Sequence, residues 1–191
     1  MLSQPVASRT ANHARRVSFQ SFDRDDGLVD IEGRIVDTKN YPYFDRERGM
    51  LAPGDPVHDI SVRVTINDQL VVRSVEVSMD AVPFTFCGGG ADGAQALVGA
   101  SIAEGWRRRL SECLGRTAGC THLRELLLAL GTVAFQTVSA SRDQSLREQG
   151  QGDSDRTDNP FFLNGCYSWS QDSPVVARYF PQYAVPGKKR E

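Results

Sequence analysis

The fold is decided by residues 58–79, HDISVRVTINDQLVVRSVEVSM. Apolar side chains occupy alternate positions on both sides of Asn67-Asp68, a dipeptide typical of tight turns. Alternation with a period of two predicts half-buried strands, so the stretch as a whole predicts an antiparallel hairpin. The apolar parity changes between Val72 and Val75, which predicts a β-bulge in the second strand.

A further strand is predicted upstream, from Gly27. Its apolar positions alternate with charged residues and are Val29, Ile31 and Ile35. The same face continues to Asp37 and Lys39, which belong either to a strand end that runs into solvent or to a polar pocket. Residues 40–57 are rich in Pro and Gly and are expected to form a loop. Three antiparallel strands therefore precede the first helix.

Three helical segments follow in the sequence. The first is predicted from Asp92 to Val98 and ends at Gly99. Ser101 and Glu104 have the spacing of a capping box, which predicts a helix from Ile102. The longest apolar stripe at helical spacing begins after Thr121, its expected cap, and consists of Leu123, Leu126, Leu127, Leu130, Ala134 and Val138. Strands followed by helices predict an α+β fold, with an antiparallel sheet of three or more strands and helices packed on one face.

The chain of 191 residues is long enough to bury a core without disulfide bonds. The predicted organisation is a flexible arm (1–16), a single α+β domain (17–140), a flexible connector (141–159) and a C-terminal hairpin packed on the same domain (160–185). A net charge of -2 argues against nucleic-acid binding. Four irregularly spaced cysteines and a polar start without a signal or membrane segment favour the cytoplasm and no membrane partner.

The chemically distinctive stretch is Gly-Cys-Thr-His-Leu at residues 119–123. It places Cys120 and His122 at the start of the long helix, where the helix dipole favours a thiolate. Thiolate and imidazole are also preferred zinc ligands. The sequence thus indicates either a metal site or a thiolate site, although each residue taken singly also fits ordinary packing.

The predicted hairpin brings two further candidates to this site. His58 stands before its first strand and Cys87 after its second, and a hairpin returns its ends to the same edge of a sheet. The predicted metal ligands are therefore His58, Cys87, Cys120 and His122, in tetrahedral zinc stoichiometry. The predicted catalytic residues are His58, Asp59, Asp37 and Lys39. Asp59 would orient His58, replace a ligand, or act with His58 as acid and base if a coordination position stays open.

Several motifs resemble an uncharacterised bacterial family that is described only as a domain of unknown function. They are Arg24-Asp25-Asp26-Gly27-Leu28, Asp37-Thr38-Lys39, Pro56-Val57-His58-Asp59 and Gly119-Cys120-Thr121-His122-Leu123. The resemblance covers most of residues 15–180. It implies homology and supplies no activity.

Residues 54–140 also resemble the NifU/IscU-type iron–sulphur cluster scaffolds, in which three cysteines, a histidine and a nearby aspartate bind zinc or a nascent cluster. The resemblance places His58 and Cys87 at the first two cysteine positions, and Cys120 with His122 near an adjacent His-Cys pair. It implies a NifU/IscU-like arrangement. Because only two thiolates remain here, the set suits zinc better than an iron–sulphur cluster.

The leading hypothesis is a metal-binding protein whose expected ion is zinc. It would be a metal-dependent hydrolase or lyase that acts on a small molecule. The alternative is a noncatalytic carrier or scaffold of the NifU/IscU type, which passes a metal, sulphur or an iron–sulphur cluster to an accepting protein. In a third interpretation the zinc is purely structural.

Overall fold

The computed structural model of the chain describes residues 1–150, 160 and 162–186. The chain divides into two compact units, Met1–Ala134 and Phe135–Glu191. No described helix combines the length and the apolar character needed to cross a membrane.

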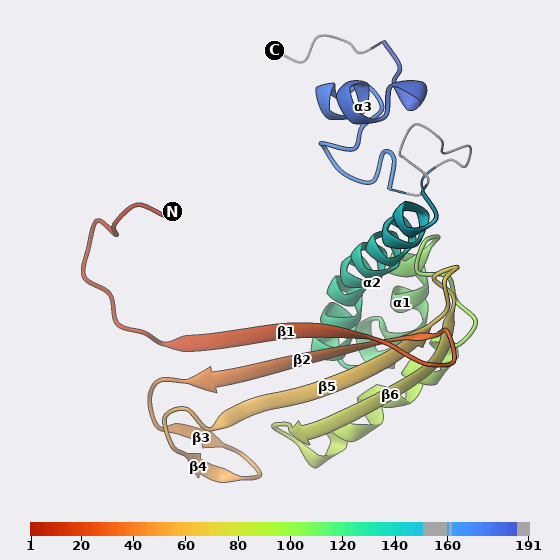
Figure 1. Cartoon of the computed structure of the whole chain (residues 1–191). Coiled ribbons are helices and arrows are strands. Elements are labelled where there is room, and N and C mark those ends of the chain that lie inside the picture. The colour runs from red at the N-terminus through yellow and green to blue at the C-terminus, as the bar shows by residue number, and fades with distance from the viewer. Residues whose placement is uncertain (151–159, 161, 187–191) are drawn as a thin grey trace. The chain divides into compact units, whose positions relative to one another are not determined.

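The first unit is built on a four-stranded antiparallel sheet with the order β1-β2-β5-β6 (Figure 1). The strands are β1 (His13–Asp23), β2 (Val29–Lys39), β5 (Pro56–Ile66) and β6 (Val72–Ala81). The predicted hairpin is confirmed as β5 and β6. The predicted bulge is confirmed too, because Ile66 pairs with Val72 and Thr65 with Ser74, which leaves Arg73 without an opposite residue.

Two segments predicted to be irregular contain strands. The flexible arm predicted for residues 1–16 is wrong from His13 onward, where β1 begins and pairs with the whole of β2. Most of β1 is exposed, so its sequence lacks the alternation that marks a half-buried strand. The predicted loop 40–57 contains a small hairpin of β3 (Tyr43–Asp45) and β4 (Gly49–Leu51), and β5 already begins at its end.

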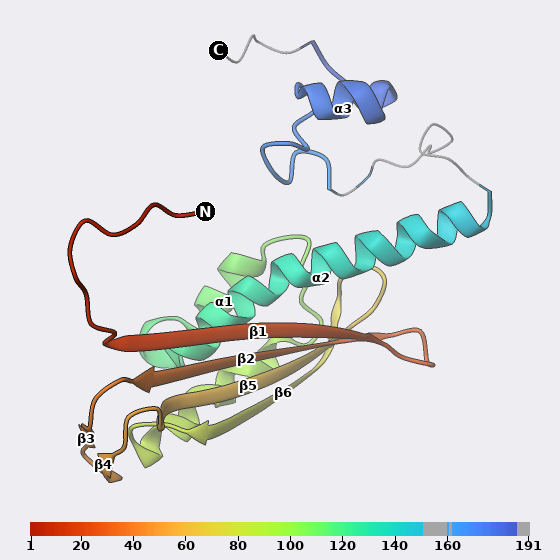
Figure 2. The ribbon, with the colours of Figure 1, turned by 60° about the vertical axis from the view of Figure 1, so that its left-hand side comes forward.

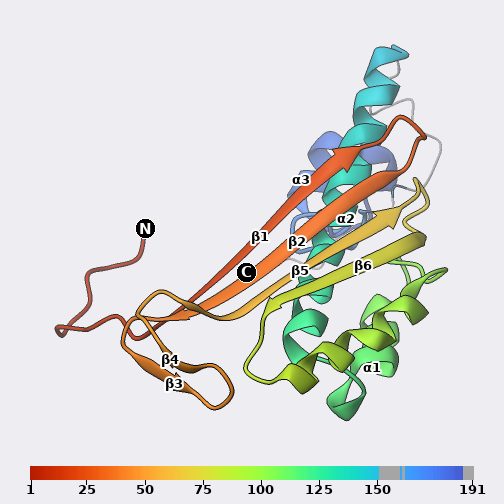
Figure 3. The ribbon, with the colours of Figure 1, turned by 90° about the horizontal axis from the view of Figure 1, so that it is seen from below.

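Helices cover one face of this sheet, as the views of Figures 2 and 3 show. They are the 3-10 helices η1 (Thr85–Leu97) and η2 (Arg116–Ala118), together with α1 (Trp106–Leu114) and the part of α2 (Thr121–Glu148) that belongs to the first unit. The core between the layers includes Ile31, Ile35, Ile60, Val64, Leu110, Leu114, Leu123, Leu126, Leu127 and Leu130, all almost fully buried. The predicted α+β class and the predicted apolar helix stripes are thus confirmed.

The helix starts differ from those predicted. Helix α1 begins at Trp106 and not at Ile102, because Gly105 just before it has a left-handed φ of 69°. The Ser101 hydroxyl still accepts a hydrogen bond from the backbone of Glu104, at 3.2 Å. Helix α2 begins at Thr121, so the residue immediately before it is Cys120.

In the second unit, the structure differs from the predicted connector (141–159) and the predicted C-terminal hairpin (160–185). Helix α2 continues to Glu148, through the first residues of the predicted connector 141–159, whose residues 151–159 lie outside the described part. Where residues 160–185 were predicted to form a hairpin, the described residues form α3 (Pro174–Tyr179) and η4 (Pro181–Tyr183). Ser173 caps α3 by accepting a hydrogen bond from Val176 at 3.1 Å. The packing of this segment on the first domain stays a prediction.

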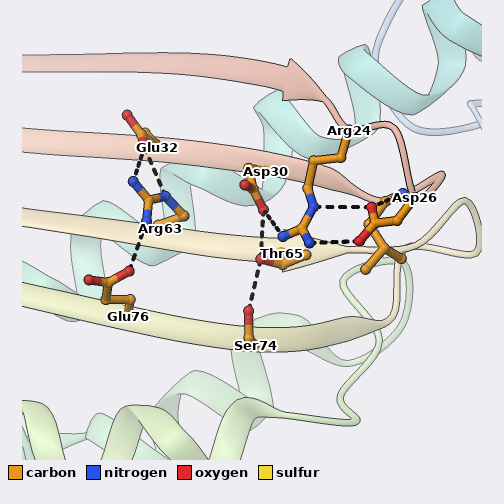
Figure 4. A network of polar contacts seen from close by, with 9 residues as sticks. Arg24, Asp26, Asp30, Glu32, Arg63, Thr65, Ser74 and Glu76 are labelled. Atoms are coloured by element: carbon orange, nitrogen blue, oxygen red, sulfur yellow. Dashed lines mark hydrogen bonds and ion pairs between the residues drawn. The ribbon is translucent and has the colours of Figure 1, made fainter.

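The sheet face opposite the helices carries paired charges (Figure 4). The Arg63 guanidinium lies between Glu32 and Glu76, at 2.7 and 2.9 Å. Beside it, Thr65 donates a hydrogen bond to Asp30 at 2.6 Å. These groups satisfy one another.

Candidate metal centre

The centre is organised around Asp37, near the end of β2. Its side chain lies on the same sheet face as the core residues Ile31 and Ile35, and like them it is almost fully buried, at 1% exposure. The interpretation that this strand end runs into solvent is therefore wrong for Asp37, whereas Lys39 is partly exposed. In the sheet register Asp37 stands opposite Arg15 of β1 and His58 of β5. One row across three strands thus carries a cation, a carboxylate and an imidazole.

Arg15 holds the Asp37 carboxylate with two hydrogen bonds, from Nε to Oδ1 at 2.7 Å and from Nη2 to Oδ2 at 2.8 Å. Its Nη1 also donates to Glu125 of α2 at 3.2 Å. Burial by itself raises the pKa of Asp37. The hydrogen bond and charge of Arg15, together with the nearby His58 and His122, outweigh burial, so the pKa lies below its ordinary value and the carboxyl is ionised at neutral pH.

All three histidines of the chain approach this carboxylate. His13 Nε2 lies 3.3 Å from Oδ1, while His58 Nδ1 and His122 Nε2 lie 3.2 and 3.6 Å from Oδ2. The rings of His58 and His122 have centroids 3.9 Å apart and planes tilted by 34°. Ligand atoms of Asp37, His58 and His122 lie within 4.8 Å of one another, the only such group of three among the described residues.

Both imidazoles at this point favour the neutral form. Burial lowers the pKa of His58, and the positive charge of a protonated His122 lowers it further. Burial and then the charge of Arg15 lower the pKa of His122, and Asp37 offsets this only in part. A neutral imidazole has a free lone pair on one ring nitrogen, and this neutral form is the one that binds a metal ion.

His58 Nδ1 is a buried nitrogen without a hydrogen-bond partner in the described structure. It lies 3.2 Å from the Asp37 carboxylate, but the contact lacks hydrogen-bond geometry. An unsatisfied buried polar group costs about 1–3 kcal/mol. A cation bound beside this nitrogen would satisfy it and Asp37 together.

Cys120 lies next to the group rather than in it. Its Sγ is 3.9 Å from His122 Nδ1, the ring nitrogen that does not face Asp37. Its backbone N–H donates to Gly90 of η1 at 2.9 Å. The predicted meeting of the segment after the hairpin with the start of the long helix therefore occurs, through backbone atoms.

The structure does not bring the other predicted site residues into the group. Cys87 lies in η1, where its N–H donates to Phe84 at 2.9 Å, and it is not part of the three-residue group. Asp59 accepts two hydrogen bonds from Arg34, at 2.7 and 2.5 Å, and not one from His58, because neighbouring strand residues point to opposite faces. Lys39 Nζ lies 5.8 Å from the Tyr43 ring centroid.

Sequence reasoning missed His13, Arg15 and Glu125. The first two lie in the segment 1–16 that was predicted to be an arm. The strand-favouring residues Val17, Phe19 and Phe22 follow directly after that segment. Glu125 follows His122 by three residues, so both point from the same side of α2. The spacing of His122 and Glu125 was visible in the sequence, but the long-range contact between Glu125 and Arg15 was not.

No curated protein and no solved structure matches the chain. A family model, described as "Protein of unknown function (DUF2889)", matches residues 13–136. The match begins at His13 and contains every residue of the cluster described above. The chain therefore belongs to the DUF2889 family.

Proposed function

We propose that this protein binds a divalent metal ion through Asp37, His58 and His122, and that this ion is zinc. In this proposal the protein is a metal-dependent hydrolase or lyase that acts on a small molecule. The observation that carries the proposal is the convergence of two histidines, whose pKa values are lowered, on one buried carboxylate. Among the described residues, His58 Nδ1 has no hydrogen-bond partner.

The donor set fits such an ion. Two imidazoles and one carboxylate are typical of catalytic zinc sites that keep a position open for substrate, and of non-haem iron(II) sites. A bound ion of this kind polarises a carbonyl group or activates water. Two histidines and a carboxylate leave that position free, whereas a closed structural zinc site would need a fourth protein ligand.

The surrounding residues would fix the ligands. Arg15 engages both oxygens of Asp37, but each carboxylate oxygen has a second lone pair that remains available. Cys120 touches the Nδ1 of His122, which leaves Nε2 directed at Asp37. Contacts of this kind set the orientation of a metal-binding imidazole.

A carrier of the NifU/IscU type is the alternative proposal. It requires thiolates at the site, because iron–sulphur clusters are held mainly by cysteine. Neither Cys87 nor Cys120 belongs to the described group, so the donor set supports the enzyme proposal better.

Metal analysis of protein purified without added metal tests the proposal. We expect about one ion per chain in the wild type, and loss of the ion in His58→Ala and His122→Ala. Cys87→Ser is the matched control, because it removes a predicted ligand outside the group, and it should keep full metal content. Full metal content in both histidine variants would refute the site. Loss in Cys87→Ser would favour the thiolate-containing set instead.

A second candidate function rests on the order of contacts from Cys120 to His122 to Asp37. A thiol before the first turn of a helix, an imidazole beside it and a carboxylate on the other ring nitrogen are the parts of a cysteine nucleophile system. Its test is the rate of alkylation by iodoacetamide in chelator. If Cys120 reacts no faster than Cys166, which is exposed, the nucleophile role fails.

A further inference from the structure

Within the described residues of the first unit, strand β1 forms an open edge of the sheet. It is the first strand in the order β1-β2-β5-β6 and runs for 11 residues without a bulge. Its sequence HARRVSFQSFD contains neither proline nor lysine. Its charged residues lie toward its two ends, so residues 17–22 carry no charge, and Val17 and Phe22 are 46% and 40% exposed. Natural edge strands are usually short, bulged, charged or covered, because an open edge pairs with other chains.

The register shows which backbone groups of β1 are open. Asn40 N–H donates to Asn12 at 2.9 Å, and these two residues stand directly opposite each other one step before His13 and Lys39. Hydrogen-bonded pairs recur every second residue in an antiparallel ladder. The even-numbered residues of β1 therefore bond to β2, and its odd-numbered residues direct N–H and C=O to the open edge.

The opposite edge of the sheet is different. Val72 of β6 donates to Ala100 and accepts from Gly99, both at 2.9 Å, and Gln95 donates to the backbone of Val75 at 2.8 Å. The segment after the sheet thus occupies part of the β6 edge. Within the described residues, no backbone hydrogen bond reaches the outward groups of β1.

We propose that two copies of this chain pair through β1, antiparallel about a two-fold axis at Ser18, so that the two sheets become one continuous sheet. This register uses the whole strand, because His13 and Asp23 lie at equal distances from Ser18. It places the odd-numbered residues opposite one another, so that their open N–H and C=O groups bond. The pairing does not depend on the metal proposal.

Charge distribution favours a second copy as the occupant. The first half of β1 carries His13, Arg15 and Arg16, and the second half ends in Asp23. Antiparallel self-pairing puts the basic half beside the acidic end, with His13 opposite the partner's Asp23. It also puts Val17 opposite the partner's Phe19, which covers an exposed apolar side chain.

Sedimentation velocity of the full chain gives the first test. We expect the wild type to sediment as a dimer. Val17→Pro removes an outward N–H that β2 does not use, and proline is tolerated at that kind of edge position, so it should weaken dimerisation at least about tenfold. Val17→Ala keeps the N–H and should remain dimeric. A monomeric wild type, or a Val17→Pro dimer of unchanged affinity, would overturn the proposal.

Cross-linking gives a second test that does not require a proline in the strand. At the two-fold axis Ser18 faces its own copy as a non-hydrogen-bonded pair, whose Cα atoms lie about 4.5 Å apart, within disulfide range. Ser18→Cys should form a covalent dimer on mild oxidation. Gln20→Cys, on the same strand face but two residues from the axis, should not. Equal yields from both variants would exclude this pairing.

Discussion

Asp37 and Asp59 are carboxylates of one sheet that each accept two hydrogen bonds from an arginine, on opposite faces. Asp37 also meets the histidines, whereas Asp59 meets only Arg34 among the charged groups that lower its pKa. Asp37→Asn should therefore abolish zinc binding and lower the free energy of unfolding by about 2 kcal/mol, because Arg15 loses a charged acceptor. Isothermal titration and urea unfolding measure the two effects.

Asp59→Asn is the matched control for that experiment. It removes the same kind of ion pair from the other face, so it should cost stability without changing zinc affinity. If the two variants bind zinc alike, the carboxylate of Asp37 is not a ligand.

His58 and His122 give the metal-free protein a defined pH dependence. Their pKa values are lowered in the folded chain from 6.5, so below pH 6.5 the unfolded chain binds more protons than the folded one. The free energy of unfolding should be highest above that pH and fall as the pH drops, by at most about 1.4 kcal/mol per pH unit for each histidine. Asp37 stays ionised throughout this range and adds nothing to the slope.

Urea unfolding in chelator between pH 7 and pH 5 measures this slope. The double variant His58→Gln with His122→Gln should show a flatter profile, because it lacks both imidazoles whose pKa values folding lowers. A wild-type profile as flat as that of the double variant would contradict the lowered pKa values of these half-buried rings.

Among single residues, the sequence indicated His58 and His122 because both stand at element ends, where reactive groups are often held. It indicated Asp37 only as one of two alternatives, since a charge at a strand end is usually solvated. Asp59 was predicted as the partner of His58 because the two residues are adjacent in the sequence. The prediction is wrong because adjacent residues of a strand point to opposite faces of the sheet. The true partner came from the adjacent strand, through a register that sequence alone did not fix.

At the scale of elements, the position of α2 depends on its contact with η1. Cys120 donates to Gly90, and a Cβ at Gly90 would lie 3.1 Å from both the N and the Cβ of Cys120. Gly90→Ala should therefore shift the start of α2 and lower the free energy of unfolding by about 1–2 kcal/mol. Because His122 follows in the first turn, zinc affinity should fall as well.

Gly88→Ala is the control, since a Cβ at Gly88 meets nothing within 4 Å. It removes a glycine from the same 3-10 segment without a close contact, and it should leave stability and zinc affinity near the wild-type values. Thermal unfolding followed by circular dichroism compares the two variants. Equal melting temperatures would mean that the approach of η1 to α2 does not constrain the site.

Elements with a buried face were predicted well, and elements without one were not. The hairpin of β5 and β6 and the apolar stripe of α2 follow directly from alternation and helical period. Strand β1 is almost entirely exposed, and its position is fixed by pairing with β2, a long-range contact that leaves no periodic signal. In α3, Ser173-Pro174 was taken for a turn although the same pair starts a helix as cap and first residue.

On the scale of the whole molecule, the site and the family match coincide with the first compact unit. The unit ends at Ala134 and the match at residue 136, and all the cluster residues lie before both points. The second unit contributes no residue to the described three-residue group. Binding at the site should therefore stabilise the first unit directly.

Zinc should raise the melting temperature of the full chain and slow hydrogen exchange in one part of it. At a free zinc concentration of about 100 times Kd, binding adds about 2.7 kcal/mol to stability, and each kcal/mol shifts the melting temperature by about 2–4 °C in a chain of this size. Exchange should slow most in peptides that cover β2, the start of β5 and the start of α2, because they carry Asp37, His58 and His122. Peptides from residues 162–186 should keep their metal-free rates. Asp37→Asn should show neither effect, and slowed exchange confined to the second unit would place the zinc site elsewhere.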